Sequence, residues 1–203
     1  GWQSEQYMPT EERRLTSFAA NDKFPGGLGP TVRMAKDEFG VETFLVWHAL
    51  TGYWGGVHPP SFPQYDVQPV ARSFSPGILH YYPDHNEKWW VSVIGVVSPN
   101  FIDCYYQDYH RSLRQQGVDG VKVDTQASLE AVSAGRGGRV SMMQRYHEAL
   151  EGSAQVHFGG RLINCMSLSN DMLYSALSSN LTRTSTDFWP ERPHTHGLHL
   201  YVN

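Results

Sequence analysis

Apolar residues along the chain recur with two different spacings. Val32, Ala35 and Phe39 lie at helical spacing and predict a helix. Gly40 is expected to end that helix. The apolar and β-branched run 43–49 follows directly and predicts a buried strand. One helix followed by one strand makes the first α/β step of the chain.

The same two spacings continue toward the C-terminus. Ser98-Pro99 predicts a helix start with Ser98 as the N-cap, and Gly117 predicts the end of that helix. Buried helical faces are predicted from Ile102, Tyr105, Tyr109 and Leu113, and from Val140, Met143, His147 and Leu150. Further helices are predicted at 139–153 and 171–178, with a helical start after Pro193, and further strands at 118–124, 161–166 and 181–185.

Residues 50–98 interrupt this alternation. They are rich in Gly, Pro and aromatic residues, and only 90–97 has the pattern of a short strand. A loop of this length in a compact domain is usually functional. We therefore expect a long loop insertion at about 50–98 beside the functional site.

The alternation of helices and strands predicts an α/β fold with a parallel sheet. Such a sheet is either doubly wound or closed as a (β/α)8 TIM barrel. No glycine fingerprint of the dinucleotide-binding or P-loop type follows a strand, which favours the barrel. A full barrel takes about 250 residues, and four β/α steps are legible here. The sequence therefore predicts a partial barrel, middle strands and helices only, with residues 1–203 a fragment of one catalytic domain.

Composition narrows the classes of protein. The 203 residues carry 16 Lys and Arg against 20 Asp and Glu, a net charge of −4, which excludes the basic footprint of a nucleic-acid binder. Apolar runs are too short to cross a membrane. Two cysteines, outside any CxxC motif, predict a reducing, cytoplasmic compartment. Aromatic residues make up 13% of the chain, which suits a sugar-binding protein. No cofactor is expected.

Polar side chains gather where the predicted strands end, and barrels place their reacting groups at these positions. Lys122 and Asp124 fall on the same side of one strand, so the lysine would keep the carboxylate ionised. Arg183 and Asp187 could form a similar pair at another strand end. Two such carboxylates match a glycosidase, in which one attacks the anomeric carbon and the other protonates the leaving oxygen. The alternative is that both aspartates only cap helices or pair with the neighbouring cations.

Four stretches carry a resemblance to a known family. They are Val-Trp-His-Ala-Leu-Thr-Gly-Tyr-Trp-Gly-Gly at 46–56, Gly-Val-Asp-Gly-Val-Lys-Val-Asp at 117–124, Asn-Cys-Met-Ser at 164–167 and Asp-Phe-Trp-Pro at 187–190. Together they resemble the raffinose synthase and alkaline α-galactosidase family, within glycoside hydrolase family 36. The resemblance runs over nearly the whole chain. Gly1-Trp2-Gln3-Ser4 is similar to the end of the Asp-Asp-Gly-Trp-Gln strand tip of that family.

The resemblance implies a retaining barrel enzyme acting on α-galactosides such as raffinose-family sugars and galactinol, by hydrolysis or transfer. Asp124 would be the nucleophile that forms a galactosyl-enzyme intermediate, and Asp187 the acid/base. The substrate-binding residues would be Trp2, Trp47, Trp54, Lys122, Cys165 and Arg183. The family pattern Arg-x-Ser-Asp-Asp-Phe-Trp-Pro has Thr186 in place of its first acid here. The first and last strands of the barrel would lie outside the chain.

Two other functions are weighed against this enzyme. Thr186 motivates a catalytically weak, sugar-binding homologue. His194, His196 and His199 could hold a metal ion in a metal-dependent barrel hydrolase. Because no predicted strand end presents these histidines, surface or packing roles are favoured and no metal is expected. His48 and His147 are interpreted as structural histidines.

Overall fold

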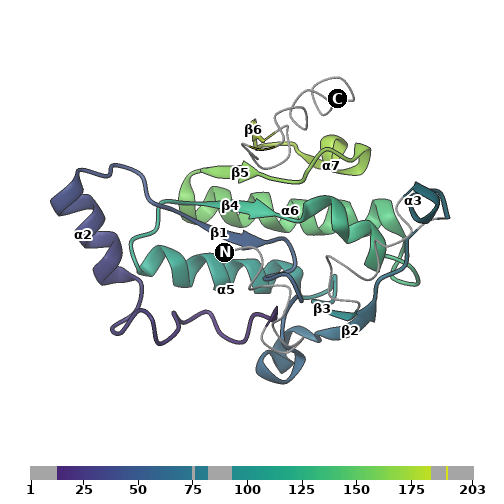
Figure 1. Cartoon of the computed structure of the whole chain (residues 1–203), viewed down its shortest axis with the longest axis horizontal. Coiled ribbons are helices and arrows are strands. Elements are labelled where there is room, and N and C mark those ends of the chain that lie inside the picture. The colour runs from purple at the N-terminus through teal and green to yellow at the C-terminus, as the bar shows by residue number, and fades with distance from the viewer. Residues whose placement is uncertain (1–12, 75, 82–92, 184–190, 192–203) are drawn as a thin grey trace.

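The computed structural model describes residues 13–74, 76–81, 93–183 and 191. Four strands form a parallel sheet in the order β1-β4-β5-β6, and Figure 1 shows them side by side in this order. Their bounds are Leu45–Ala49 for β1, Gly120–Asp124 for β4, Leu162–Asn164 for β5 and Leu181–Thr182 for β6. The α/β class with a parallel sheet is therefore confirmed. Closure into a barrel stays a prediction.

One principal helix precedes β1, and the others lie between the successive strands of this sheet. These helices are α2 (Gly29–Phe39), α5 (Ile102–Gln115), α6 (Arg139–Phe158) and α7 (Asn170–Ser175), with the 3-10 helix η4 at Gln126–Val132. Helices α5 and α6 pack against each other, and α6 also contacts β4 and β5 (Figure 1). The Ser153 hydroxyl donates a hydrogen bond to the Tyr106 carbonyl oxygen at 2.9 Å across the two helices. The core of the fold lies between these helices and one face of the sheet, and it continues into residues 57–97 of the insertion.

The two faces of the sheet differ in chemistry. Successive side chains on a strand point to opposite faces. His48 and Val123 are buried on the helix side, so Trp47, Lys122 and Asp124 lie on the opposite side, where each is half-buried. Trp47 pairs with Lys122 in the register of β1 and β4, and Ala49 pairs with Asp124. The register therefore brings the predicted site residues to one face.

The insertion at about 50–98 contains structure of its own. It holds the 3-10 helices η2 (Pro59–Ser61) and η3 (Pro63–Tyr65), the strands β2 (Gln68–Ala71) and β3 (Val93–Val96), and the short helix α3 (Pro76–Tyr81). β2 and β3 pair in antiparallel fashion, which confirms the predicted short strand. At Gly95 a Cβ atom would lie 1.6 Å from the Val57 carbonyl oxygen, so only glycine fits where β3 passes the first part of the insertion.

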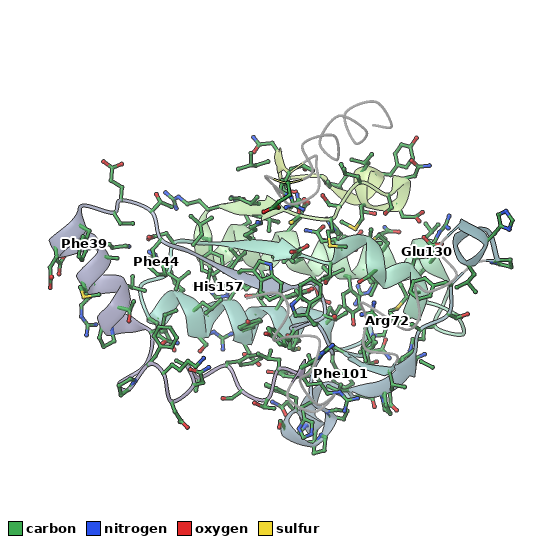
Figure 2. All side chains as sticks on the ribbon, viewed as in Figure 1. Phe39, Phe44, Arg72, Phe101, Glu130 and His157 are labelled. Atoms are coloured by element: carbon green, nitrogen blue, oxygen red, sulfur yellow. The ribbon has the colours of Figure 1, made fainter. Side chains whose placement is uncertain are left out.

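Three local predictions are wrong. Ser98 does not cap α5, because the N-cap is Phe101, whose N–H donates to the Ser98 carbonyl oxygen in a preceding turn. Phe39 is 73% exposed at the outer end of α2, away from the sheet (Figure 2), and Val140 is 65% exposed. Both lie on the predicted faces but beyond the stretch that has packing partners. The helical start after Pro193 lies outside the described residues.

Two buried histidines meet behind β1. His48 Nδ1 lies 2.8 Å from the Ala49 carbonyl oxygen, so this nitrogen carries the proton and donates. His48 Nε2 then accepts from His110 Nε2 on α5, at 3.2 Å. Burial lowers the pKa of His48 to about 4, against a small opposing effect of its hydrogen bond to Ala49. Burial also lowers the pKa of His110 well below its ordinary value, as do the positive charges that His48 and His157 would carry.

We expect this histidine pair to make the protein sensitive to acid. His48 is protonated at about pH 6.5 in the unfolded chain and only at about pH 4 in the folded one, so its stabilising contribution is complete above pH 6.5 and declines toward pH 4. The pKa shift corresponds to a loss of about 3 kcal/mol. Urea unfolding of the natural-length protein between pH 7.5 and 4.5 measures the slope. His48→Gln should reduce the dependence of the unfolding free energy on pH. Equal slopes in the wild type and in His48→Gln would contradict the prediction.

Candidate functional site

The carboxylate of Asp124 is held at the C-terminal end of β4. Trp47 Nε1 donates a hydrogen bond to Asp124 Oδ2 at 3.0 Å. The Thr125 backbone N–H donates to Asp124 Oδ1 at 2.7 Å. Thr125 has a φ of 59°, a left-handed conformation that costs free energy in a β-branched residue and is found disproportionately at functional sites. Both carboxylate oxygens are thus oriented by donors on the chain.

Aromatic side chains form a wall beside this carboxylate. The Trp47 ring lies 5.7 Å from that of Trp54 and meets Tyr53 edge to face at 5.9 Å. The loop that follows β1 supplies both Tyr53 and Trp54. Since the Trp47 ring nitrogen is bound to Asp124, the aromatic wall and the carboxylate form one site.

The ends of β5 and β6 bring further groups to the same place. The Cys165 N–H donates to the Val123 carbonyl oxygen, and the Arg183 N–H donates to the Asn164 carbonyl oxygen, each at 2.9 Å. These bonds continue the parallel pairing one residue past the strands. Cys165 and Arg183 therefore follow Asp124 across the C-terminal edge of the sheet.

The Cys165 thiol lies close enough to Asp124, Arg183 and Lys122 for their charges to change its pKa. Burial raises its pKa to about 11, together with the negative charge of Asp124 and a hydrogen bond to that carboxylate. The positive charges of Arg183 and Lys122 oppose this rise. Cys165 is therefore a protonated thiol at neutral pH and donates to Asp124. Two cations, a carboxylate and a thiol share one edge of the sheet.

Six of the eight predicted site residues are assembled in this way. They are Trp47, Trp54, Lys122, Asp124, Cys165 and Arg183. Trp2 and Asp187 lie outside the described residues, so their places are not given. Within the described residues, no group of three or more His, Cys, Asp or Glu side chains could hold a metal ion. The candidate metal ligands His194, His196 and His199 lie outside that part of the chain.

Comparison with known sequences identifies the family. The profile described as "Raffinose synthase or seed imbibition protein Sip1" matches residues 9–202. The chain belongs to the raffinose synthase family. The resemblance predicted from four short stretches is confirmed over nearly the full chain.

Curated members of the raffinose synthase family align with most of the chain. It is 39% identical over 207 residues to the probable galactinol–sucrose galactosyltransferase 1 of Arabidopsis thaliana, covering 92% of the chain and 27% of that protein. It is 38% identical over 190 residues to the galactinol–sucrose galactosyltransferase of Pisum sativum, covering 87% and 24%. Stachyose synthase of Pisum sativum is 34% identical over 157 residues, covering 76% and 18%. The chain thus spans about a quarter of the length of these relatives.

Sequence reasoning missed several polar residues of this family member. Tyr53 lies within the stretch 46–56, and its place directly before Trp54 could have marked it as part of the aromatic wall. Gln126 and Asn164 follow or end strands, are fully buried, and bond to each other at 2.8 Å. The signal for Asn164 was a polar side chain inside the predicted strand 161–166, whereas Gln126 lies beyond the predicted strand 118–124 and had no such signal.

Proposed function

We propose that the protein carrying this chain is a retaining glycosidase or transglycosidase that acts on α-galactosides, with Asp124 as its nucleophile. The observation that carries this proposal is the Asp124 carboxylate, oriented by Trp47 and Thr125 at a strand end among Lys122, Cys165 and Arg183. The names of the curated relatives support galactinol as the galactosyl donor and sucrose as the acceptor.

The proposal includes a (β/α)8 barrel. The parallel strands lie side by side in the order in which they occur along the chain, with no reversal. A barrel has this order, whereas a doubly wound sheet reverses at a switch point. Asp124 lies at the C-terminal end of its strand, where barrel enzymes carry their active sites. The remaining strands would come from the rest of the natural-length protein.

The reaction would run in two displacements. An Asp124 oxygen attacks the anomeric carbon of the galactoside, and the bond to the leaving oxygen breaks as Asp187 gives that oxygen its proton. In the second displacement Asp187 takes a proton from the acceptor hydroxyl or from water. The acceptor oxygen then displaces Asp124 and restores the α configuration. Asp187 enters here from the family resemblance alone.

The surroundings of Asp124 suit a sugar ring. Lys122 and Arg183 supply cationic donors for hydroxyl groups, and the wall of Trp47, Trp54 and Tyr53 supplies faces for the apolar side of a pyranose.

Cys104 and Cys165 are both free thiols, which supports a reducing, cytoplasmic location. Within the described residues, no helix is both long and apolar enough to cross a bilayer.

The product of the first turnover tests this function. The natural-length protein, incubated with galactinol and sucrose, is expected to transfer galactose to sucrose in an α linkage, read by NMR at early times. Full activity in EDTA is expected as well, since no step uses a metal ion. A first product of β configuration would contradict the proposal, as would the absence of turnover of every α-galactoside offered.

A second candidate, a catalytically weak sugar-binding homologue, rests on Thr186 in place of the first acid of the family pattern. It predicts binding of a galactose oligosaccharide in calorimetry with no product after long incubation. Turnover at a rate typical of enzymes, about 1 s⁻¹ or more, would exclude it. Thr186→Asp separates the two functions, because a marked gain in rate would locate the weakness at this position.

A further inference from the structure

A buried polar network lies behind the candidate site, on the helix side of the sheet. Its central members Gln126, Asn164 and His147 are each 1% exposed or less. Polar side chains buried to this extent cost stability unless they are hydrogen-bonded. The question is what the bonds of this network hold in place.

Gln126 is fixed by three hydrogen bonds. Its Nε2 donates to the Val123 carbonyl oxygen at 2.9 Å and to Asn164 Oδ1 at 2.8 Å. Its Oε1 accepts from His147 Nε2 on α6 at 2.8 Å. The Val123 carbonyl oxygen defines the orientation of the amide, because a carbonyl only accepts and reversing the amide would place one acceptor against another.

These bonds lead directly to the nucleophile. The Val123 carbonyl precedes Asp124, and it accepts from both Gln126 and the Cys165 N–H. Thr125, between Asp124 and Gln126, has the left-handed conformation that aims its N–H at Asp124 Oδ1. Holding the Gln126 side chain under the sheet therefore holds the turn that orients the carboxylate above it.

The network also reaches the next strands. Asn164 Nδ2 donates to the Ser179 hydroxyl oxygen at 2.8 Å, and the Ser179 N–H donates to Glu151 on α6 at 3.0 Å. Ser179 lies just before β6, and Arg183 lies just after β6. One connected set of bonds thus ties together the ends of β4 and β5 and the start of β6.

We propose that Gln126 is a positioning residue for the Asp124 nucleophile, acting with Asn164 from the opposite side of the sheet. This inference rests on the proposed function, since it assigns Asp124 the attack on the anomeric carbon. Gln126 does not touch the substrate. Its role is to keep the Asp124–Thr125 turn in the one conformation that presents the carboxylate correctly.

Two variants of the natural-length protein test the proposal, Gln126→Met and Asn164→Leu, which keep side-chain size and remove the hydrogen bonds. With p-nitrophenyl α-galactoside, kcat is expected to fall about 10- to 100-fold, since small misplacements of a reacting group cost that much. KM, and the Kd of galactose by calorimetry, should change by less than about threefold. If the role of these residues were purely structural, the variants would yield less folded protein, and the folded part would not show a lowered kcat with an unchanged KM.

The matched control is Ser153→Ala, which removes one buried hydrogen bond between α6 and α5. It should lower the melting temperature and leave kcat unchanged. Wild-type kcat in folded Gln126→Met, with Asp124→Ala inactive, would overturn this inference alone. Full activity of Asp124→Ala would instead overturn the proposed function. Failure of both network variants to fold would make the network purely structural and also overturn the inference.

Discussion

Replacing Asp124 with alanine is expected to lower kcat/KM on an aryl α-galactoside by several powers of ten, each worth about 1.4 kcal/mol of barrier. The reason is that the proposed chemistry needs a carboxylate oxygen at the anomeric carbon, and Trp47 and Thr125 orient this one for it. Steady-state kinetics of the natural-length protein measure the effect. Asp103→Ala is the control, because Asp103 is exposed on α5 and bonds only to the surface residue Arg145 among the described residues.

Azide separates the loss of a nucleophile from a general loss of structure. In Asp124→Ala the small anion can occupy the space left by the carboxylate and attack the same face of the sugar. The expected product is β-galactosyl azide, formed at a rate that rises with azide concentration. An Asp124→Ala variant that keeps wild-type activity without azide would exclude Asp124 as the nucleophile.

Replacing Glu151 with alanine is expected to cause the largest loss of stability among single polar substitutions in this network. The Glu151 carboxylate accepts from the N–H groups of Leu177, Ser178 and Ser179 and from both serine hydroxyls. It is 6% exposed, so its removal would leave a cavity on α6 and take the shared acceptor away from the backbone N–H groups of 177–179. We expect a loss of about 3 kcal/mol in the free energy of unfolding, measured in urea. Glu148→Gln, an exposed position on the same helix, should change it by less than about 0.5 kcal/mol.

The pH dependence of Glu151 has a defined sign. Burial raises its pKa, but the hydrogen bonds from Ser179, Ser178 and Leu177 together outweigh burial and leave the pKa below its ordinary value. Its contribution is therefore complete above the pKa of an unfolded glutamate, near 4.5, and is lost as the pH falls through the lower folded value. If the difference in stability between wild type and Glu151→Ala stayed constant through this range, the assignment would be wrong.

Local sequence signals predicted most elements because their causes are local. Gly40 adopts the left-handed conformation that ends α2, and Gly159 does the same for α6, six residues past the predicted end. Periodicity identified the buried face of α5 correctly, from Ile102 to Leu113. It failed at Phe39 and Val140, because a repeat reveals which face is apolar but not how far along the helix its neighbours extend.

The site was predictable where one strand carried the pattern and not where distant segments meet. Alternation along β4 placed Lys122 and Asp124 on one face correctly. The bond from Trp47 to Asp124 joins residues 77 positions apart and follows from the register of β1 and β4, which the sequence does not specify. The partners of Gln126 depend in the same way on where α6 lies against the sheet.

The most direct test of the account is to trap the covalent intermediate. The natural-length protein would be incubated with a fluorinated galactosyl fluoride, which forms the intermediate faster than it is released, then quenched, digested and analysed by mass spectrometry. The account predicts one fluorogalactosyl group on the peptide that contains Asp124, and none in Asp124→Ala. A label on another carboxylate, or an unlabelled protein that still consumes the reagent, would contradict it.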